Sequence, residues 1–159
     1  MSIVNHCGTC TSCCKTYAIP ELDKKAGTWC KNCDIGQGCR IYENRPEPCR
    51  TYACLWLLSQ RHSQPMDPDL RPDRCKVVIG PATDPKILSF GMTTGYYDAW
   101  RKTPGIMDLI KKMVRMDMRA VIDTPVSTTK IVVDSAGERE VEMSEPDESG
   151  TQWYIGPAK

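Results

Sequence analysis

Ten cysteines crowd the first half of this sequence and constrain its fold more than any other feature. No cysteine follows Cys75 in the chain of 159 residues. The step Cys-x2-Cys begins at Cys7, Cys10 and Cys30, and it lets two thiolates reach one ion from a single turn. Because the step repeats, we expect metal binding by thiolates. All ten cysteines are candidate metal ligands: Cys7, Cys10, Cys13, Cys14, Cys30, Cys33, Cys39, Cys49, Cys54 and Cys75.

The number of metal centres is suggested by the adjacent pair Cys13 and Cys14. In an extended backbone neighbouring side chains point apart, so we expect these two thiols to serve different centres. Ten thiols also exceed the four ligands of one tetrahedral site. The sequence therefore favours two centres and at least eight bound cysteines, and it leaves open which cysteines share a centre.

Sulfur ligands leave the identity of the metal open between zinc and an iron–sulfur cluster. Zinc is the first expectation and a cluster is the alternative. His6 and His62 are the only histidines, so we do not expect a histidine-rich catalytic zinc site, and His6 is expected to be an exposed side chain. A disulfide scaffold is a further alternative, but it would need an oxidising compartment, of which the sequence shows no sign.

Charge and hydropathy bound the partners and the location. The chain has 21 Lys and Arg against 20 Asp and Glu, so we expect neither nucleic acid nor a membrane as a partner. Residues 1–10 lack the basic and apolar regions of a secretory signal, and no apolar run approaches the about 18 residues of a spanning helix. We therefore expect a cytoplasmic protein, in which thiols stay reduced.

Three regions predict an α+β fold. Residues 1–62 are expected to be an irregular, metal-stapled half, closed by a helix near residues 47–60. Residues 63–79 contain three prolines and form a connecting segment that carries Cys75. Residues 80–159 are expected to form a small α+β segment with an acidic polar tail, through which a protein partner could bind.

The pattern after Cys75 predicts a small antiparallel sheet with one helix. Residues 76–79, 87–90 and 120–122 have the composition of strands, and residues 130–143 resemble a hairpin. Pro104 can open a helix, since apolar residues then recur at helical spacing.

Several side chains near the cysteines have expected supporting roles. Bound thiolates accumulate negative charge, which nearby cations can offset. Arg50 directly follows Cys49, so a place beside the metal is expected there, whereas Lys15 and Lys31 are expected to be ordinary surface cations. Arg40 and Arg45 are also close enough in sequence to offset thiolate charge. The side chains expected to pack around the centre are Ile41, Tyr42, Tyr52 and Trp56.

The string CGTCTSCC at residues 7–14 resembles the defining motif of the CxxCxxCC zinc/iron-chelating family, the YkgJ-like cysteine-cluster proteins. The resemblance continues to residue 56 and extends to LRPDRC at residues 70–75. It implies metal chelation by these cysteines and no particular activity. A similar cluster occurs in flagellin lysine-N-methylases, where it looks like an iron–sulfur site. Methyl transfer is not carried over, because residues 91–95 only weakly echo a methyl-donor motif.

Four functional hypotheses follow from these features. The first is a structural zinc module that contacts a partner, since metal binding can supply folding free energy. The others are an iron–sulfur protein with a redox or enzyme-supporting role, a metal storage or delivery protein, and a component of a larger assembly. No catalytic residue is predicted, because Asp67, Asp69 and Asp73 are expected to lie on a solvated loop.

Overall fold

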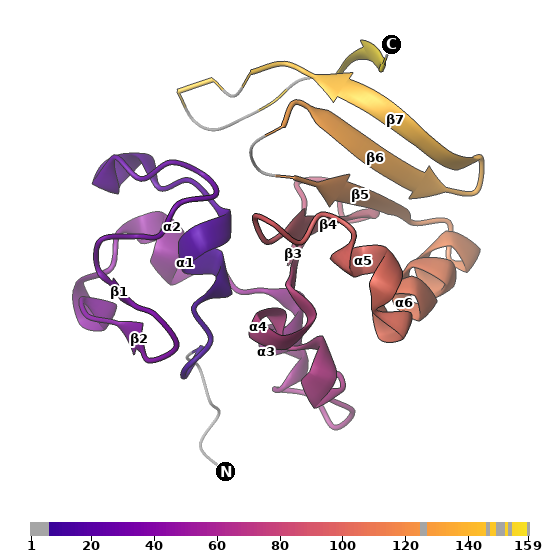
Figure 1. Cartoon of the computed structure of the whole chain (residues 1–159). Helices are drawn as coiled ribbons and strands as arrows, with labels where there is room; N and C mark the ends of the chain where they lie inside the picture. Colours follow the sequence, from indigo (N-terminus) through magenta and orange to yellow (C-terminus); the bar gives the residue numbers. More distant parts are fainter. Residues whose placement is uncertain (1–6, 125–126, 146, 149–151, 153, 159) are drawn as a thin grey trace.

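The structure, a computed structural model, describes residues 7–124, 127–145, 147–148, 152 and 154–158. It has an α+β fold, as predicted, with a cysteine-rich half beside a larger sheet that carries helices (Figure 1). Among the described residues, no helix is long and apolar enough to cross a membrane.

The cysteine-rich half is built from short elements joined by turns, and none of them exceeds five residues. Prolines open several of them, since a missing N–H costs nothing in a first helical turn. In chain order they are α1 (Ser12–Thr16), η1 (Pro20–Leu22), β1 (Cys33–Asp34), β2 (Gly38–Cys39), η2 (Tyr42–Asn44), α2 (Glu47–Thr51), α3 (Leu55–Ser59), η3 (Pro68–Leu70) and α4 (Pro72–Cys75).

The single helix expected near residues 47–60 was wrong, because the chain forms α2 and α3 with a break between them. Tyr52 and Cys54 both have extended backbone, with ψ of 131° and 158°. Helical periodicity continues across the break, so the sequence pattern did not reveal it. The break directs Tyr52 toward the sheet and places Cys54 at the start of α3.

The sheet has six strands in sequential order, and one of its pairs is parallel. The expected sheet was smaller and wholly antiparallel. β4 and β5 run parallel, and the crossover between them contains two helices, α5 and α6, where one helix was expected. The elements are β3 (Val77–Pro81), β4 (Ile87–Met92), α5 (Ala99–Lys102), α6 (Pro104–Arg115), β5 (Arg119–Asp123), β6 (Thr129–Asp134), β7 (Gly137–Met143) and β8 (Tyr154–Pro157).

One face of the sheet packs on α5 and α6 and forms the main core. Phe90 and Met92 are fully buried there with Trp100 and Ile106. Because side chains alternate along a strand, Gly91 lies on the opposite face. That second face is available to the cysteine-rich half.

The cysteine-rich half packs against the sheet through two tyrosines. The Tyr17 hydroxyl donates a hydrogen bond to the carbonyl oxygen of Val78 over 3.3 Å, and its ring lies 5.5 Å from the ring of Tyr52 in an edge-on arrangement. A Cβ atom added at Gly91 would lie 2.7 Å from the Tyr17 hydroxyl, and one at Gly80 would lie 2.6 Å from that of Tyr52. Gly91 is therefore a packing residue in β4.

Strand β3 joins the two halves of the molecule. α1, α3 and α4 all contact it, and the boundary expected between residues 79 and 80 falls inside it. The segment expected to be a connecting loop contains η3 and α4, and α4 ends at Cys75 immediately before β3.

Candidate metal centre

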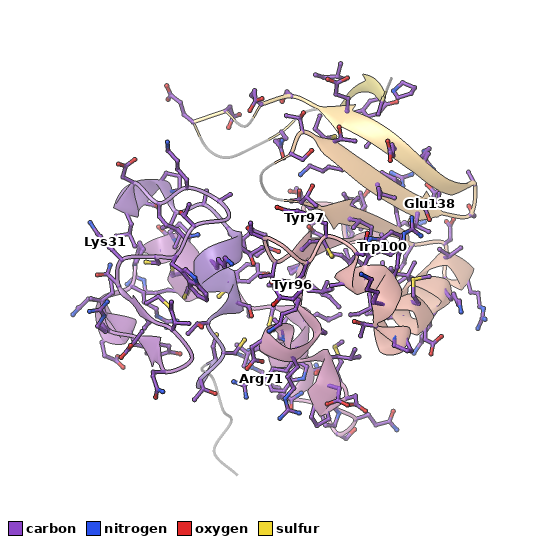
Figure 2. The ribbon with its side chains drawn as sticks, in the orientation of Figure 1. Lys31, Arg71, Tyr96, Tyr97, Trp100 and Glu138 are labelled. Atoms are coloured by element: carbon purple, nitrogen blue, oxygen red, sulfur yellow. The ribbon has the colours of Figure 1, made fainter. Side chains whose placement is uncertain are left out.

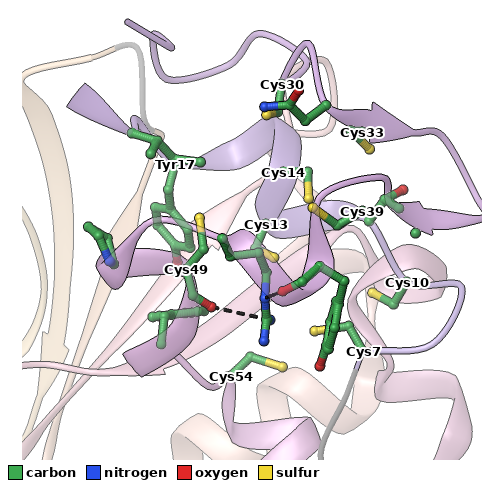
Figure 3. A pocket seen from close by; sticks show the side chains of 18 of the residues that line it. Cys7, Cys10, Cys13, Cys14, Tyr17, Cys30, Cys33, Cys39, Cys49 and Cys54 are labelled. Atoms are coloured by element: carbon green, nitrogen blue, oxygen red, sulfur yellow. Dashed lines mark hydrogen bonds between the residues drawn. The ribbon is translucent and has the colours of Figure 1, made fainter. Parts of the chain in front are cut away.

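Nine of the ten cysteines line one cavity of about 320 Å³ in the cysteine-rich half (Figure 3). The volume is far greater than the roughly 10–15 Å³ that a single water molecule requires. The nine residues come from several separate segments of the chain. They are Cys7, Cys10, Cys13, Cys14, Cys30, Cys33, Cys39, Cys49 and Cys54.

Backbone hydrogen bonds hold the cysteine segments together. The N–H groups of Cys10 and Cys33 donate to the carbonyls of Cys7 and Cys30, each over 3.0 Å, so these Cys-x2-Cys steps form tight turns. The N–H of Cys30 donates to the carbonyl of Cys14, also over 3.0 Å. This last bond joins helix α1 to the turn that begins at Cys30.

Cys13 and Cys14 both lie in helix α1, so the extended backbone expected for them was wrong. The thiol of Cys13 can donate its one proton to the sulfur of either Cys14 or Cys7, and this interaction lowers the pKa of Cys14 to about 6 and that of Cys7 to about 7. The same hydrogen bonds, with burial, raise the pKa of Cys13. The three thiols thus lie close together, and both members of the adjacent pair line the cavity.

Other thiols of the cavity are harder to ionise, because burial disfavours their charged form. Burial raises the pKa of Cys33 to about 12 and that of Cys54 to about 11, and it also raises the pKa of Cys49. At neutral pH these thiols keep their protons unless a cation takes the protons' place.

Arg45 is the predicted cation that approaches the thiols. Its guanidinium stacks 3.6 Å from the centre of the Tyr42 ring and donates to the Tyr42 carbonyl over 2.7 Å and the Cys49 carbonyl over 3.4 Å. Its charge adds to the effect of the Cys13 hydrogen bonds in lowering the pKa of Cys7 and Cys14.

The remaining predicted cations lie farther from the centre. Arg50, which was expected beside the thiols, is exposed, and Arg45 lies beside them instead. Arg40 donates to the Lys31 carbonyl over 2.9 Å, and Lys31 lies at the outer edge of this half (Figure 2). Lys15 lies 5.5 Å from the Trp29 ring, as a surface cation would.

Lys24 is a buried cation that the sequence did not point to. Its ammonium donates to the carbonyls of Lys15 and Tyr17, at the end of α1. Burial lowers the pKa of Lys24, and the thiols of Cys30 and Cys14 partly oppose this effect. A lysine in a polar stretch such as DKK carries no sequence signal of burial.

The structure does not bring Cys75 to the cavity. The residue is 6% exposed and belongs to the core under the sheet. Its thiol lies 3.4 Å from the carbonyl oxygens of Leu70 and Val77 and can donate its proton to either. Cys75 therefore packs as a small apolar residue.

Other predicted side chains lie as follows. Ile41, Tyr42, Tyr52 and Trp56 line the cavity, in agreement with the packing role expected for them. Asp67 accepts a hydrogen bond from the N–H of Asp69, and Asp69 and Asp73 form ion pairs with arginines. His62 is exposed, and His6 lies outside the described residues.

The donor set fits a thiolate-bound metal. Nine thiols, an apolar wall that includes Ile19 and Leu57, and cations nearby suit a buried centre with negative charge. All ten cysteines are free thiols. In the described part of the chain, no three His, Cys, Asp or Glu side chains are arranged to hold one ion. The thiols thus surround a shared space, and separate closed sites are not preformed.

Comparisons with known proteins found no matching family model, curated protein or solved structure. The resemblance to the CxxCxxCC family therefore stays a prediction that rests on the motif.

Proposed function

We propose that this protein binds metal through cysteine thiolates, and that the bound metal holds the cysteine-rich half in its folded form. The observation that carries the proposal is the convergence of nine cysteines on one cavity. The helices and strands of the cysteine-rich half are too short to be stable alone. A metal centre would supply the missing folding free energy.

Zinc is the first candidate metal. It accepts thiolate ligands without redox chemistry, and closed zinc–thiolate sites commonly serve structural roles. The ligands would come from the nine cysteines of the cavity, without Cys75. We expect the protein to work in the cytoplasm, where its free thiols stay reduced.

An iron–sulfur cluster is the second candidate, and the shape of the site favours it. The thiols surround one continuous cavity, which suits a centre of several atoms better than two separate ions. Its walls include apolar side chains such as Ile19 and Leu57, and the surroundings of a cluster are one of the features that tune it.

The deciding experiment is anaerobic purification, followed by an absorption spectrum and analysis of metal and sulfide in the same sample. Zinc in a colourless protein would support the first candidate. Iron, acid-labile sulfide and broad visible absorption would support the second. A preparation with no bound metal, which also fails to take up zinc or iron under reducing conditions, would refute the proposal.

A further inference from the structure

Lys24 is a buried lysine whose charge has no carboxylate partner among the described residues. Lys24 is only 7% exposed, and none of the ion pairs among the described residues includes it. A buried charge is costly unless it is compensated. Neutral carbonyls of Lys15 and Tyr17 accept its hydrogen bonds, so they solvate the ammonium without balancing it.

The backbone holds Lys24 in this place. Ile19 and Lys24 exchange two hydrogen bonds, over 2.9 and 3.1 Å, across a tight turn. Asp23, at the end of η1, has a left-handed φ of 48°, which closes the turn. The ammonium then reaches the last carbonyls of α1, the helix that carries Cys13 and Cys14. A cation is favourable at a helix C-terminus.

The anions available to Lys24 are thiolates. Its ammonium donates to the carbonyl of Lys15, the residue after Cys14, and the carbonyl of Cys14 accepts a hydrogen bond from the N–H of Cys30. The positive charge therefore lies beside the segments that carry Cys13, Cys14 and Cys30, all of which line the cavity. The thiols of Cys30 and Cys14 favour the charged form of Lys24, against the larger effect of burial, which lowers its pKa.

We propose that Lys24 is the counter-cation of the metal–thiolate centre. Its ammonium balances part of the negative charge that the bound thiolates accumulate, and its bonds to the end of α1 keep Cys13 and Cys14 at the cavity. Lys24 is thus a positioning and charge-balancing residue, not a ligand. This inference rests on the proposed function, since it presumes thiolate-bound metal.

Three variants separate charge from shape. Lys24→Gln keeps a hydrogen-bond donor but removes the charge, and Lys24→Arg keeps the charge. Lys25→Gln is the matched control, because the neighbouring Lys25 is exposed. The probe is cobalt(II), titrated anaerobically into the reduced, metal-free full chain, with zinc then added in competition to obtain zinc affinity. Thiolate-to-cobalt absorption reports the bound sulfurs.

We expect Lys24→Gln to bind metal about 10- to 100-fold more weakly, as is typical when a group that supports metal ligands is lost. Absorption per bound cobalt should stay at the wild-type value, because the same cysteines bind. Lys24→Arg and Lys25→Gln should keep wild-type affinity.

Equal affinity of Lys24→Gln and Lys25→Gln would overturn the inference, as would equal losses in Lys24→Gln and Lys24→Arg. If Lys24→Gln does not fold, Lys24→Arg still decides, because a tenfold loss there contradicts charge balance. Failure of the wild-type protein to bind cobalt, zinc or iron under reducing conditions would instead refute the proposed function itself, and the inference with it.

Discussion

Gly91 offers a direct test of how the cysteine-rich half packs on the sheet. It lies in β4, on the face opposite the main core, under the ring of Tyr17. A Cβ atom at this position would lie 2.7 Å from the Tyr17 hydroxyl, 3.1 Å from the adjacent ring carbon and 3.2 Å from the Thr16 methyl group. We predict that Gly91→Ala forces α1 away from the sheet.

The expected cost is that of overpacking, about 1–3 kcal/mol of unfolding free energy. In a chain of this size, that loss lowers the melting temperature by about 2–12 °C. Gly156→Ala is the matched control in β8, because a Cβ atom there meets nothing within 4 Å. Its effect should stay within about 0.5 kcal/mol, as for substitutions that disturb no packed contact.

The assay is urea and thermal unfolding of the purified protein, with the double variant Gly91→Ala/Tyr17→Phe as an internal check. Removal of the hydroxyl relieves the closest contact, although the contact with the ring carbon remains. The double variant should therefore lose less unfolding free energy than the sum of the losses in Gly91→Ala and in Tyr17→Phe. Equal stability of Gly91→Ala and Gly156→Ala would refute the packing described for Tyr17.

Three further predictions concern the cavity and the sheet. Cys33→Ala should lower the metal content of the purified protein, whereas Cys75→Ala should not, and elemental analysis of both checks this. Metal affinity should fall as the pH is lowered, because protons compete with the metal for thiols such as that of Cys54, whose pKa is raised by burial. Competition titrations between pH 6 and 8 test this, and an affinity that does not change with pH would contradict it. Asp134→Asn should cost about 1 kcal/mol at neutral pH, since the carboxylate, 12% exposed, accepts two hydrogen bonds of 2.9 Å from Arg139. Those bonds hold the pKa of Asp134 well below its usual range, so their stabilisation is present at neutral pH and is lost in acid, and the two proteins should converge in urea unfolding as the pH falls.

Local patterns in the sequence determined the individual elements of the second half. β3, β4, β5 and the β6–β7 hairpin lie where strand-like composition placed them, and α6 begins at Pro104 as expected. These elements were predictable because alternation and helical spacing depend on residues close together in the chain. The tight turns of the Cys-x2-Cys steps were predictable for the same reason.

Only the tertiary structure decided which cysteines share a space. Cys14 and Cys30 are joined by a backbone hydrogen bond across two segments, whereas Cys75 points into the apolar core. The same long-range packing broke the expected helix at Tyr52, because its ring lies against Gly80. The sequence alone determined that thiols are plentiful and arranged in repeated Cys-x2-Cys steps. Their common cavity, and the buried lysine behind it, depend on contacts between distant segments, which no local pattern encodes.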